Sequence, residues 1–191
     1  MMNAQDQKSV VELALNGVAV HVAPVVGERL SETLRERLNV RDVKIGCNAG
    51  DCGACTVLVD NEAVCSCLVP AQQAAGRVVE TLSGLVKSDI HAKALMERFQ
   101  DHGAAQCGIC TPGMMVSAVG LLRKNPTPTE QNVKDALGGV LCRCTGYRKI
   151  IDAILAVPAT LDSSGGAGST LRRLDGFEKV TGVEAFGDDV A

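Results

Sequence analysis

Cysteine spacing constrains this chain more than any other feature. Cys47, Cys52 and Cys55 form a C-x4-C-x2-C run, and Cys67 follows twelve positions after Cys55. This is the spacing of a plant-type 2Fe–2S site, in which four thiolates hold two irons. The pattern therefore predicts an iron–sulfur cluster held by Cys47, Cys52, Cys55 and Cys67.

Glycines within the run support this interpretation. A loop that brings three thiolates to one iron pair must curl tightly, and we expect Gly46, Gly50 and Gly53 to adopt positive φ there. Such a loop also turns backbone N–H groups toward the sulfurs. Structural zinc fits an x4 spacing poorly. We expect no disulfides, because nine cysteines are an odd number and the stretch MMNAQDQKSV has no apolar run of the length typical of a signal peptide.

Residues before and after the run predict a small mixed sheet. Two β-rich runs, 10–17 and 18–24, meet at Asn-Gly, which is a strong hairpin signal. Residues 27–39 carry leucines at i, i+4 and i+8, so they predict a helix packed on the sheet. CTVLVD and EAVCSC form a second hairpin around Asp60-Asn61. We expect the cysteine loop at the edge of this sheet.

Cys65 competes with Cys67 for the fourth position. The two alternate along one predicted strand and would face the same side, so spacing alone cannot separate them. We favour Cys67 because it begins the segment that leads into a helix, and we expect Cys65 to be a small buried apolar residue.

The second half of the chain predicts helices. The first ends at His102-Gly103, the second begins at Thr111-Pro112, and the third begins at a capping box over Thr127–Glu130 and stops at Gly138-Gly139. A last helix follows in the segment RKIIDAIL. The apolar positions assigned to the four helices are Ile90, Ala94, Leu95 and Phe99; Met115, Ala118, Val119 and Leu122; Val133, Ala136 and Leu137; and Ile150, Ile151, Ile154 and Leu155.

Each of two helix–loop units in this half carries a cysteine pair. Cys107 and Cys110 form a C-x2-C, and Cys142 and Cys144 form a C-x-C. Antiparallel packing of the helices would bring the four thiolates together, with helix N-termini stabilising an anionic cluster. By spacing alone, zinc stays open as an alternative at this second site.

Composition bounds the possible partners. The net charge of −3 is spread over both signs, which argues against a nucleic-acid surface. With three Phe, one Tyr and no Trp, the core must be aliphatic. No run of apolar residues approaches the length of a transmembrane helix. We expect a soluble cytoplasmic protein, periplasmic only if a partner carries the export signal.

Together the two cysteine sets and their surroundings resemble the iron–sulfur subunit of the xanthine oxidase family of molybdenum hydroxylases. The similar stretches are GCNAGDCGACTVLVD, SCLVPA, QCGICTPGMM and LCRCTGYRKIIDAI, in this order. The resemblance implies an α+β protein. A plant-type ferredoxin-like β-grasp domain, residues 8–84, would precede a helical four-helix-bundle domain, residues 85–160, and each domain would hold one 2Fe–2S cluster.

Site residues follow from the same resemblance. It assigns Cys47, Cys52, Cys55 and Cys67 to the first cluster and Cys107, Cys110, Cys142 and Cys144 to the second. Gln106 and Cys144 occupy positions that contact the molybdopterin of a large partner subunit, in its cytosine dinucleotide form. The alternatives for these two are a solvated glutamine and an ordinary ligand.

The implied function is electron transfer. The partner would hydroxylate a substrate, and this chain would carry the electrons through the helical-domain cluster and then the plant-type cluster. The acceptor would be a flavin subunit (FAD), a cytochrome (haem) or a soluble carrier. We find no catalytic residue in this chain. A free-standing two-cluster ferredoxin and a zinc-stabilised interaction module are the alternatives.

The C-terminus departs from this pattern. Residues 161–170 have the composition of a flexible linker. Residues 171–191 are similar to the start of the family's large subunit, with matches at Arg173, Asp175, Gly176, Lys179, Val180, Thr181, Gly182, Ala185, Asp188 and Asp189. We expect this extension to dock on the large subunit rather than to fold alone.

Overall fold

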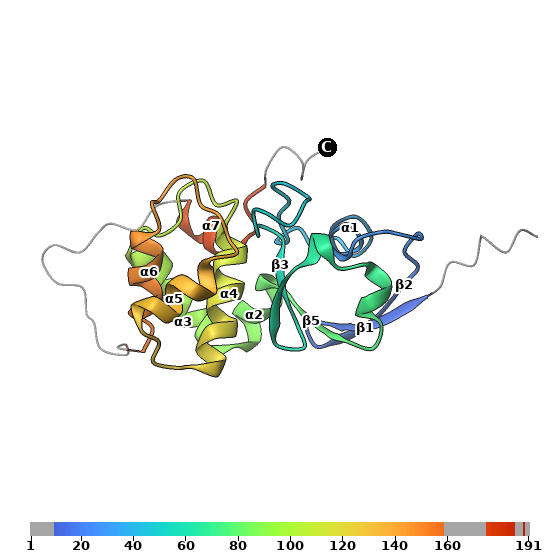
Figure 1. Cartoon of the computed structure of the whole chain (residues 1–191), viewed down its shortest axis with the longest axis horizontal. Helices are drawn as coiled ribbons and strands as arrows, with labels where there is room; N and C mark the ends of the chain where they lie inside the picture. The colour runs from blue at the N-terminus through green and yellow to red at the C-terminus, as the bar shows by residue number, and fades with distance from the viewer. Residues whose placement is uncertain (1–9, 159–174, 186–188, 190–191) are drawn as a thin grey trace, which may run out of the picture.

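The computed structural model describes residues 10–158, 175–185 and 189. Two bodies lie side by side along the long axis, a β-sheet body and a helical body (Figure 1). The predicted linker, 161–170, lies outside the described residues.

Within residues 10–158 the strands form one mixed sheet in the order β2-β1-β5-β3-β4. Both predicted hairpins are confirmed: β1 pairs antiparallel with β2, and β3 with β4. Asp60 and Asn61 turn the second hairpin with positive φ at both positions. The strand between the hairpins, β5, was not predicted; it pairs parallel with β1 and antiparallel with β3. The bounds are β1 Val11–Leu15, β2 Val18–Val22, β3 Thr56–Val59, β4 Glu62–Cys65 and β5 Val78–Glu80.

The predicted helix over 27–39 is shorter than expected. It consists of α1, Leu30–Glu32, followed by a π-helical turn, Thr33–Arg37. Leu30 and Leu34 are fully buried against the sheet, as their spacing predicts, while Leu38 lies at the margin of the core. Short 3₁₀ turns at Ser66–Leu68 and Ala71–Ala74 complete this body.

The helical body begins with α2, a helix that the sequence analysis did not predict. The bounds are α2 Leu82–Ser88, α3 Ile90–Asp101, α4 Thr111–Lys124, α5 Glu130–Leu137 and α6 Arg148–Leu155. The predicted apolar positions of α4 are buried, but Ile90 at the start of α3 is exposed. The capping box of α5 is Thr129 with Asn132, not Thr127 with Glu130, because the Thr129 hydroxyl is the group that accepts the Asn132 N–H.

Strand β3 serves both bodies at once. Val57 and Leu58 are fully buried, and because successive strand residues point to opposite faces, Val57 joins the core of the sheet body while Leu58 joins the helical core. Helix α4 packs on β3 at Gly120, which lies against Leu58. The two bodies therefore share a continuous apolar contact.

The C-terminal extension is seated on this chain. Helix α7, Gly176–Thr181, packs against α2, α3 and α4, and Val180 is buried in the helical core (Figure 1). The sequence did not predict this contact between the extension and the helices of its own chain. Docking on the large subunit stays a prediction.

Candidate iron–sulfur centres

The first cysteine loop directly precedes β3 in the sequence and curls back on itself. Gly50 and Gly53 have positive φ as predicted, but Gly46 does not; Asn48 supplies the third left-handed position. Gly46 is needed for space instead, because a Cβ there would lie 2.9 Å from the Cys52 sulfur. The curl directs the backbone N–H groups of Ala49 and Cys52 at the Cys47 sulfur, each at 3.3 Å.

The four thiols of this loop and its flank divide into two pairs. Cys47 lies beside Cys52 at the exposed rim, and Cys55 lies beside Cys67 in the interior. The N–H group of Ala49 and then that of Cys52 lower the pKa of Cys47 to about 7, whereas burial raises the pKa of Cys67 to about 11. A 2Fe–2S cluster needs this two-plus-two division, because each iron takes two thiolates.

Cys65 stands apart from both pairs. It ends β4, and its thiol lies 3.9 Å from the Gly50 carbonyl oxygen. Cys67 is in a 3₁₀ turn rather than in the strand, so the predicted alternation of Cys65 and Cys67 along one strand is wrong. The turn carries Cys67 inward to Cys55, and burial raises the pKa of Cys65.

The second set of cysteines comes together from two separate loops. The sulfurs of Cys107 and Cys144 lie 3.6 Å apart and are exposed. Cys110, the buried residue that precedes α4, lies beside Cys142, and burial raises its pKa. The set thus has the same two-plus-two division as the first. Gln106 is exposed next to Cys107.

Two residues that sequence reasoning missed hold Cys142 in place. The Thr145 hydroxyl lies 3.1 Å from the Cys142 sulfur and accepts the Tyr147 N–H at 3.1 Å. The Tyr147 hydroxyl accepts the Cys142 N–H at 2.9 Å, and Tyr147 itself has φ of 67°. A left-handed aromatic residue is strained, so the surrounding contacts must enforce it. The only sequence sign was a hydroxyl and a phenol close after C-x-C.

The two cysteine loops touch each other. The Leu141 N–H donates to the Cys52 carbonyl at 2.9 Å. Cys52 belongs to the first set of cysteines, and Leu141 directly precedes Cys142 of the second set. Glycines permit the approach: a Cβ on Gly113 would lie 2.5 Å from the Gly53 oxygen, and one on Gly53 would overlap the Gly139 carbonyl. The geometry joins the two candidate centres by one hydrogen bond.

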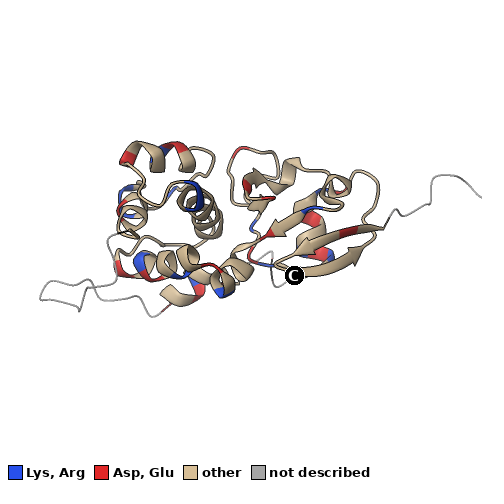
Figure 2. Cartoon of the chain, turned by 90° about the horizontal axis from the view of Figure 1, so that it is seen from below, with Lys and Arg blue, Asp and Glu red and all other residues tan. Residues whose placement is uncertain are grey.

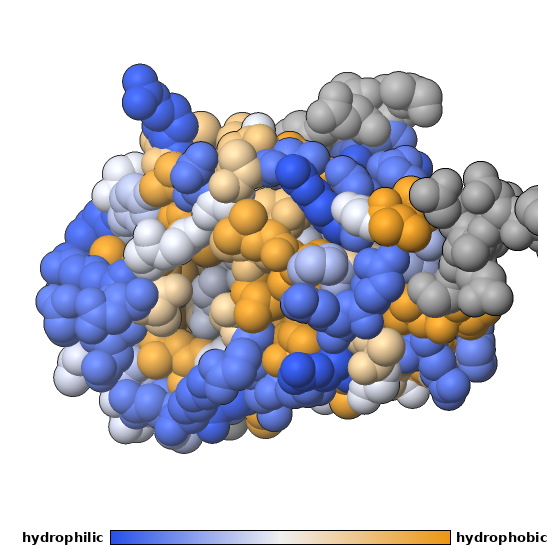
Figure 3. Space-filling model, turned by 45° about the vertical axis from the view of Figure 1, so that its right-hand side comes forward, coloured by the Kyte–Doolittle hydropathy of each residue, from blue (hydrophilic) through white to orange (hydrophobic). Residues whose placement is uncertain are grey.

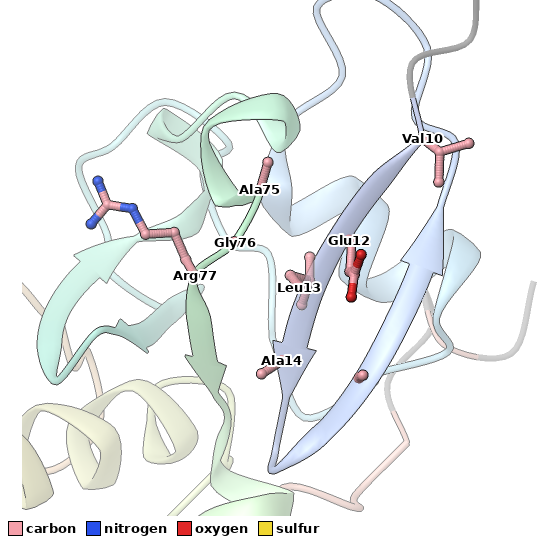
Figure 4. A pocket seen from close by; sticks show the side chains of 8 residues that line it. Val10, Glu12, Leu13, Ala14, Ala75, Gly76 and Arg77 are labelled. Carbon is pink, nitrogen blue, oxygen red and sulfur yellow. The ribbon is translucent and has the colours of Figure 1, made fainter.

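Other surface features lie away from these loops. The pocket in Figure 4 is lined by β1, Ala19 and residues 75–77, and its lining includes no cysteine. Basic and acidic residues alternate over both bodies (Figure 2), in agreement with the interspersed charges of the sequence. Among the described residues, no helix is both long and apolar enough to cross a membrane.

Comparison with known proteins identifies both halves. Residues 13–83 match the model of a 2Fe–2S iron-sulfur cluster binding domain, and residues 81–155 match that of a [2Fe-2S] binding domain. The chain is 43% identical over 156 residues to the nicotine 6-hydroxylase small subunit of Paenarthrobacter nicotinovorans, covering 82% of this chain and 93% of that protein. It is 44% identical to the nicotinate dehydrogenase small FeS subunit of Eubacterium barkeri, over 77% of this chain and 93% of that protein.

The chain belongs to the iron–sulfur subunits of the xanthine oxidase family of molybdenum hydroxylases. As a member of this family it binds two 2Fe–2S clusters and transfers electrons for a molybdopterin-dependent enzyme whose molybdenum lies on a partner subunit. The predicted α+β architecture is confirmed.

A solved structure of this family extends the similarity into the C-terminal region. Aldehyde oxidoreductase from Desulfovibrio gigas superimposes with a TM-score of 0.87 at 32% identity, covering 95% of this iron–sulfur subunit. The subunit spans only 22% of that chain.

Proposed function

We propose that the two sets of paired thiols are the cluster ligands: Cys47, Cys52, Cys55 and Cys67 in the sheet body, and Cys107, Cys110, Cys142 and Cys144 in the helical body. Their two-plus-two arrangement and the inward N–H groups at Cys47 support this assignment. When bound, each cluster accepts and releases one electron at a time. Cys65 is left as a packing residue.

The chain's contribution is to position these thiolates relative to each other and to the surface. The single observation that carries the proposal is the hydrogen bond from the Leu141 N–H to the Cys52 carbonyl, because it links a ligand of one set to the neighbour of a ligand of the other. Cys47 in one set, and Cys107 and Cys144 in the other, are exposed. Each set therefore combines a contact with its counterpart with an exposed outer side that is open to a partner.

We assign the outer side at Gln106 and Cys144 to the molybdenum subunit, where they would contact the pterin. Both residues are exposed, and Leu141, 55% exposed, adds apolar surface on the same loop as Cys144. At the sheet body, Leu68 is 63% exposed directly after Cys67. Figure 3 shows apolar residues gathered at the middle of one face with hydrophilic residues around them. Exposed apolar residues beside a redox centre suit a docking surface.

A flavin subunit or a cytochrome would then accept the electrons at the Cys47 side. We place the complex in the cytoplasm, where cysteine thiols stay reduced until clusters are inserted. A free-standing two-cluster ferredoxin is the second candidate. The chain's similarity to small subunits of hydroxylases favours the first.

The test compares Cys107→Ser with Cys65→Ser in the full chain. Iron and acid-labile sulfide content with low-temperature EPR of the reduced protein should show two distinguishable cluster signals in the unmodified chain. Cys107→Ser should remove one of them, and Cys65→Ser should keep both. The ligand assignment would be refuted if Cys65→Ser lost a cluster signal, or if Cys107→Ser kept both signals.

A further inference from the structure

Two cations of the sheet body are almost completely buried. The side chains of Arg35 and Lys44 are 5% and 2% exposed. Arg35 donates one N–H to the Val43 carbonyl at 2.7 Å, and its Nε lies 3.7 Å from a carboxylate oxygen of Glu36, whose side chain is 60% exposed. Buried charge is costly unless it is paired and hydrogen-bonded, so these two side chains require an anion.

The C-terminal extension supplies that anion. One carboxylate oxygen of Asp189 accepts from Arg35 Nη2 at 2.8 Å, and the other accepts from Lys44 Nζ at 2.9 Å. The Asp189 side chain is itself 6% exposed. Lys44 Nζ also donates to the Glu184 carbonyl at 2.9 Å. Glu184 and Asp189 thus both accept from Lys44, and Asp189 also accepts from Arg35.

The other end of the extension is held by the helical body. Val180 on α7 is 1% exposed within the helical core. Lys179 pairs with Asp175 at 3.2 Å and with Glu184 at 3.0 Å, which braces the short helix. The extension therefore has an apolar anchor in one body and an ionic anchor in the other.

Between the anchors the extension crosses the boundary of the two bodies. Gly182 has φ of +77°, and a Cβ there would lie 2.8 Å from the Asp42 Cβ and 3.2 Å from the Pro112 Cγ. Asp42 belongs to the sheet body and Pro112 to the start of α4, two residues after Cys110. Only glycine suits both the conformation and the space.

We propose that Arg35 and Lys44 form a carboxylate socket whose occupant is Asp189 of this chain's own extension, which α7 anchors to the helical body. Seated there, the extension clamps the sheet body to the helical body across Gly182. The socket is an interaction surface separate from the cluster-binding loops, and it recognises an acidic segment that reaches it from an apolar anchor on α7. A second copy's extension and the first residues of the large subunit are the other possible occupants.

Hydrogen–deuterium exchange of the full chain with both clusters tests the clamp. Asp189→Asn removes the carboxylate charge from the socket, and Asp135→Asn is the matched control, the same change at an exposed position on α5. We expect amides 176–182 to exchange at least tenfold faster in Asp189→Asn and at the unmodified rate in Asp135→Asn. Unchanged exchange in Asp189→Asn, or equal acceleration in both variants, would overturn the proposal.

Lys44→Met provides a second arm. If Lys44 and Asp189 act as a pair, Lys44→Met should accelerate the same amides, and adding Asp189→Asn should increase the rate much less than it does alone. Additive effects would refute the pairing. If protection of amides 176–182 falls on dilution, the socket is occupied by a second copy's extension. If that protection is lost on adding the large subunit, the socket is occupied by that partner. Either result overturns the assignment to this chain.

Discussion

At the scale of single residues, Thr145 is placed to tune the helical-domain centre. Its oxygen already accepts the Tyr147 N–H, so its own proton is available to the Cys142 sulfur at 3.1 Å. Such a bond favours the reduced, more negative cluster. Thr145→Val should lower the reduction potential of this cluster by roughly 40 mV, the equivalent of about 1 kcal/mol for one electron. EPR-monitored redox titration measures the shift.

The control for this prediction is Thr145→Ser, which keeps the hydroxyl. It should leave the potential within the error of the titration, and the plant-type cluster should keep its potential in both variants. An equal shift in Thr145→Val and Thr145→Ser would assign the effect to packing rather than to the hydrogen bond.

Glu28 illustrates a residue whose charge supports the fold. Its carboxylate accepts two N–H groups of Arg37, as well as the Thr33 hydroxyl and the Val25 N–H. The hydrogen bond from Arg37 lowers the pKa of Glu28 from 4.5 to about 2. Because the folded-state pKa is lowered, the stabilisation is present above pH 4.5 and is lost as the pH falls toward 2.

Glu28→Gln should therefore lower the free energy of unfolding by about 2 kcal/mol at pH 7. The gap in this free energy between the variant and the unmodified chain should narrow by about 1 kcal/mol as the pH falls from 6 to 3.5. Urea unfolding of both proteins measures the gap, and acid effects common to both cancel in the difference. Glu12→Gln, the same change at an exposed position on β1, should change the free energy of unfolding at pH 7 by less than about 0.5 kcal/mol. A gap that stays constant with pH would contradict the role of the charge.

At the scale of elements, α4 depends on glycine where it meets the first cysteine loop. A Cβ at position 113 would lie 2.5 Å from the Gly53 carbonyl oxygen, a rigid backbone atom. Gly113→Ala should destabilise the fold by about 2 kcal/mol through overpacking. Gly120→Ala, in the same helix, would meet only the end of the Leu58 side chain at 3.3 Å and should change stability by less than about 1 kcal/mol. Chemical unfolding of the two variants compares them.

Sequence patterns predicted those elements whose own periodicity or caps define them. The hairpins, α3, α4 and α6 are of this kind, as is the split of eight cysteines into two sets. Strand β5 was missed because three residues carry too little alternation, and its pairing with β1 and β3 is set by tertiary contact. The π-helical turn and the 3₁₀ position of Cys67 have no periodicity that would predict them, and the contact of Thr145 with Cys142 depends on the conformation of a short loop that lacks a recognisable pattern. A single chain's sequence does not contain those distances.

At the scale of the whole molecule, the two bodies are coupled through β3 and α4. Leu58 belongs to the sheet but is fully buried in the helical core, whereas Leu95 on α3 is buried in that core and belongs to the helical body alone. We expect the unmodified chain to unfold in one cooperative transition, since neither core is complete without the shared strand.

Leu58→Ala should therefore do more than lower stability by the 2–5 kcal/mol that is typical of a buried leucine. It should split the thermal transition, with the two cluster signals lost at different temperatures, because the contact that couples the bodies is weakened. Leu95→Ala should cost a similar amount while the transition stays single, since it leaves β3 in place. Calorimetry together with visible absorption and EPR follows both variants. A single transition in Leu58→Ala would mean that the hydrogen bond between Leu141 and Cys52 and the C-terminal extension suffice to couple the bodies.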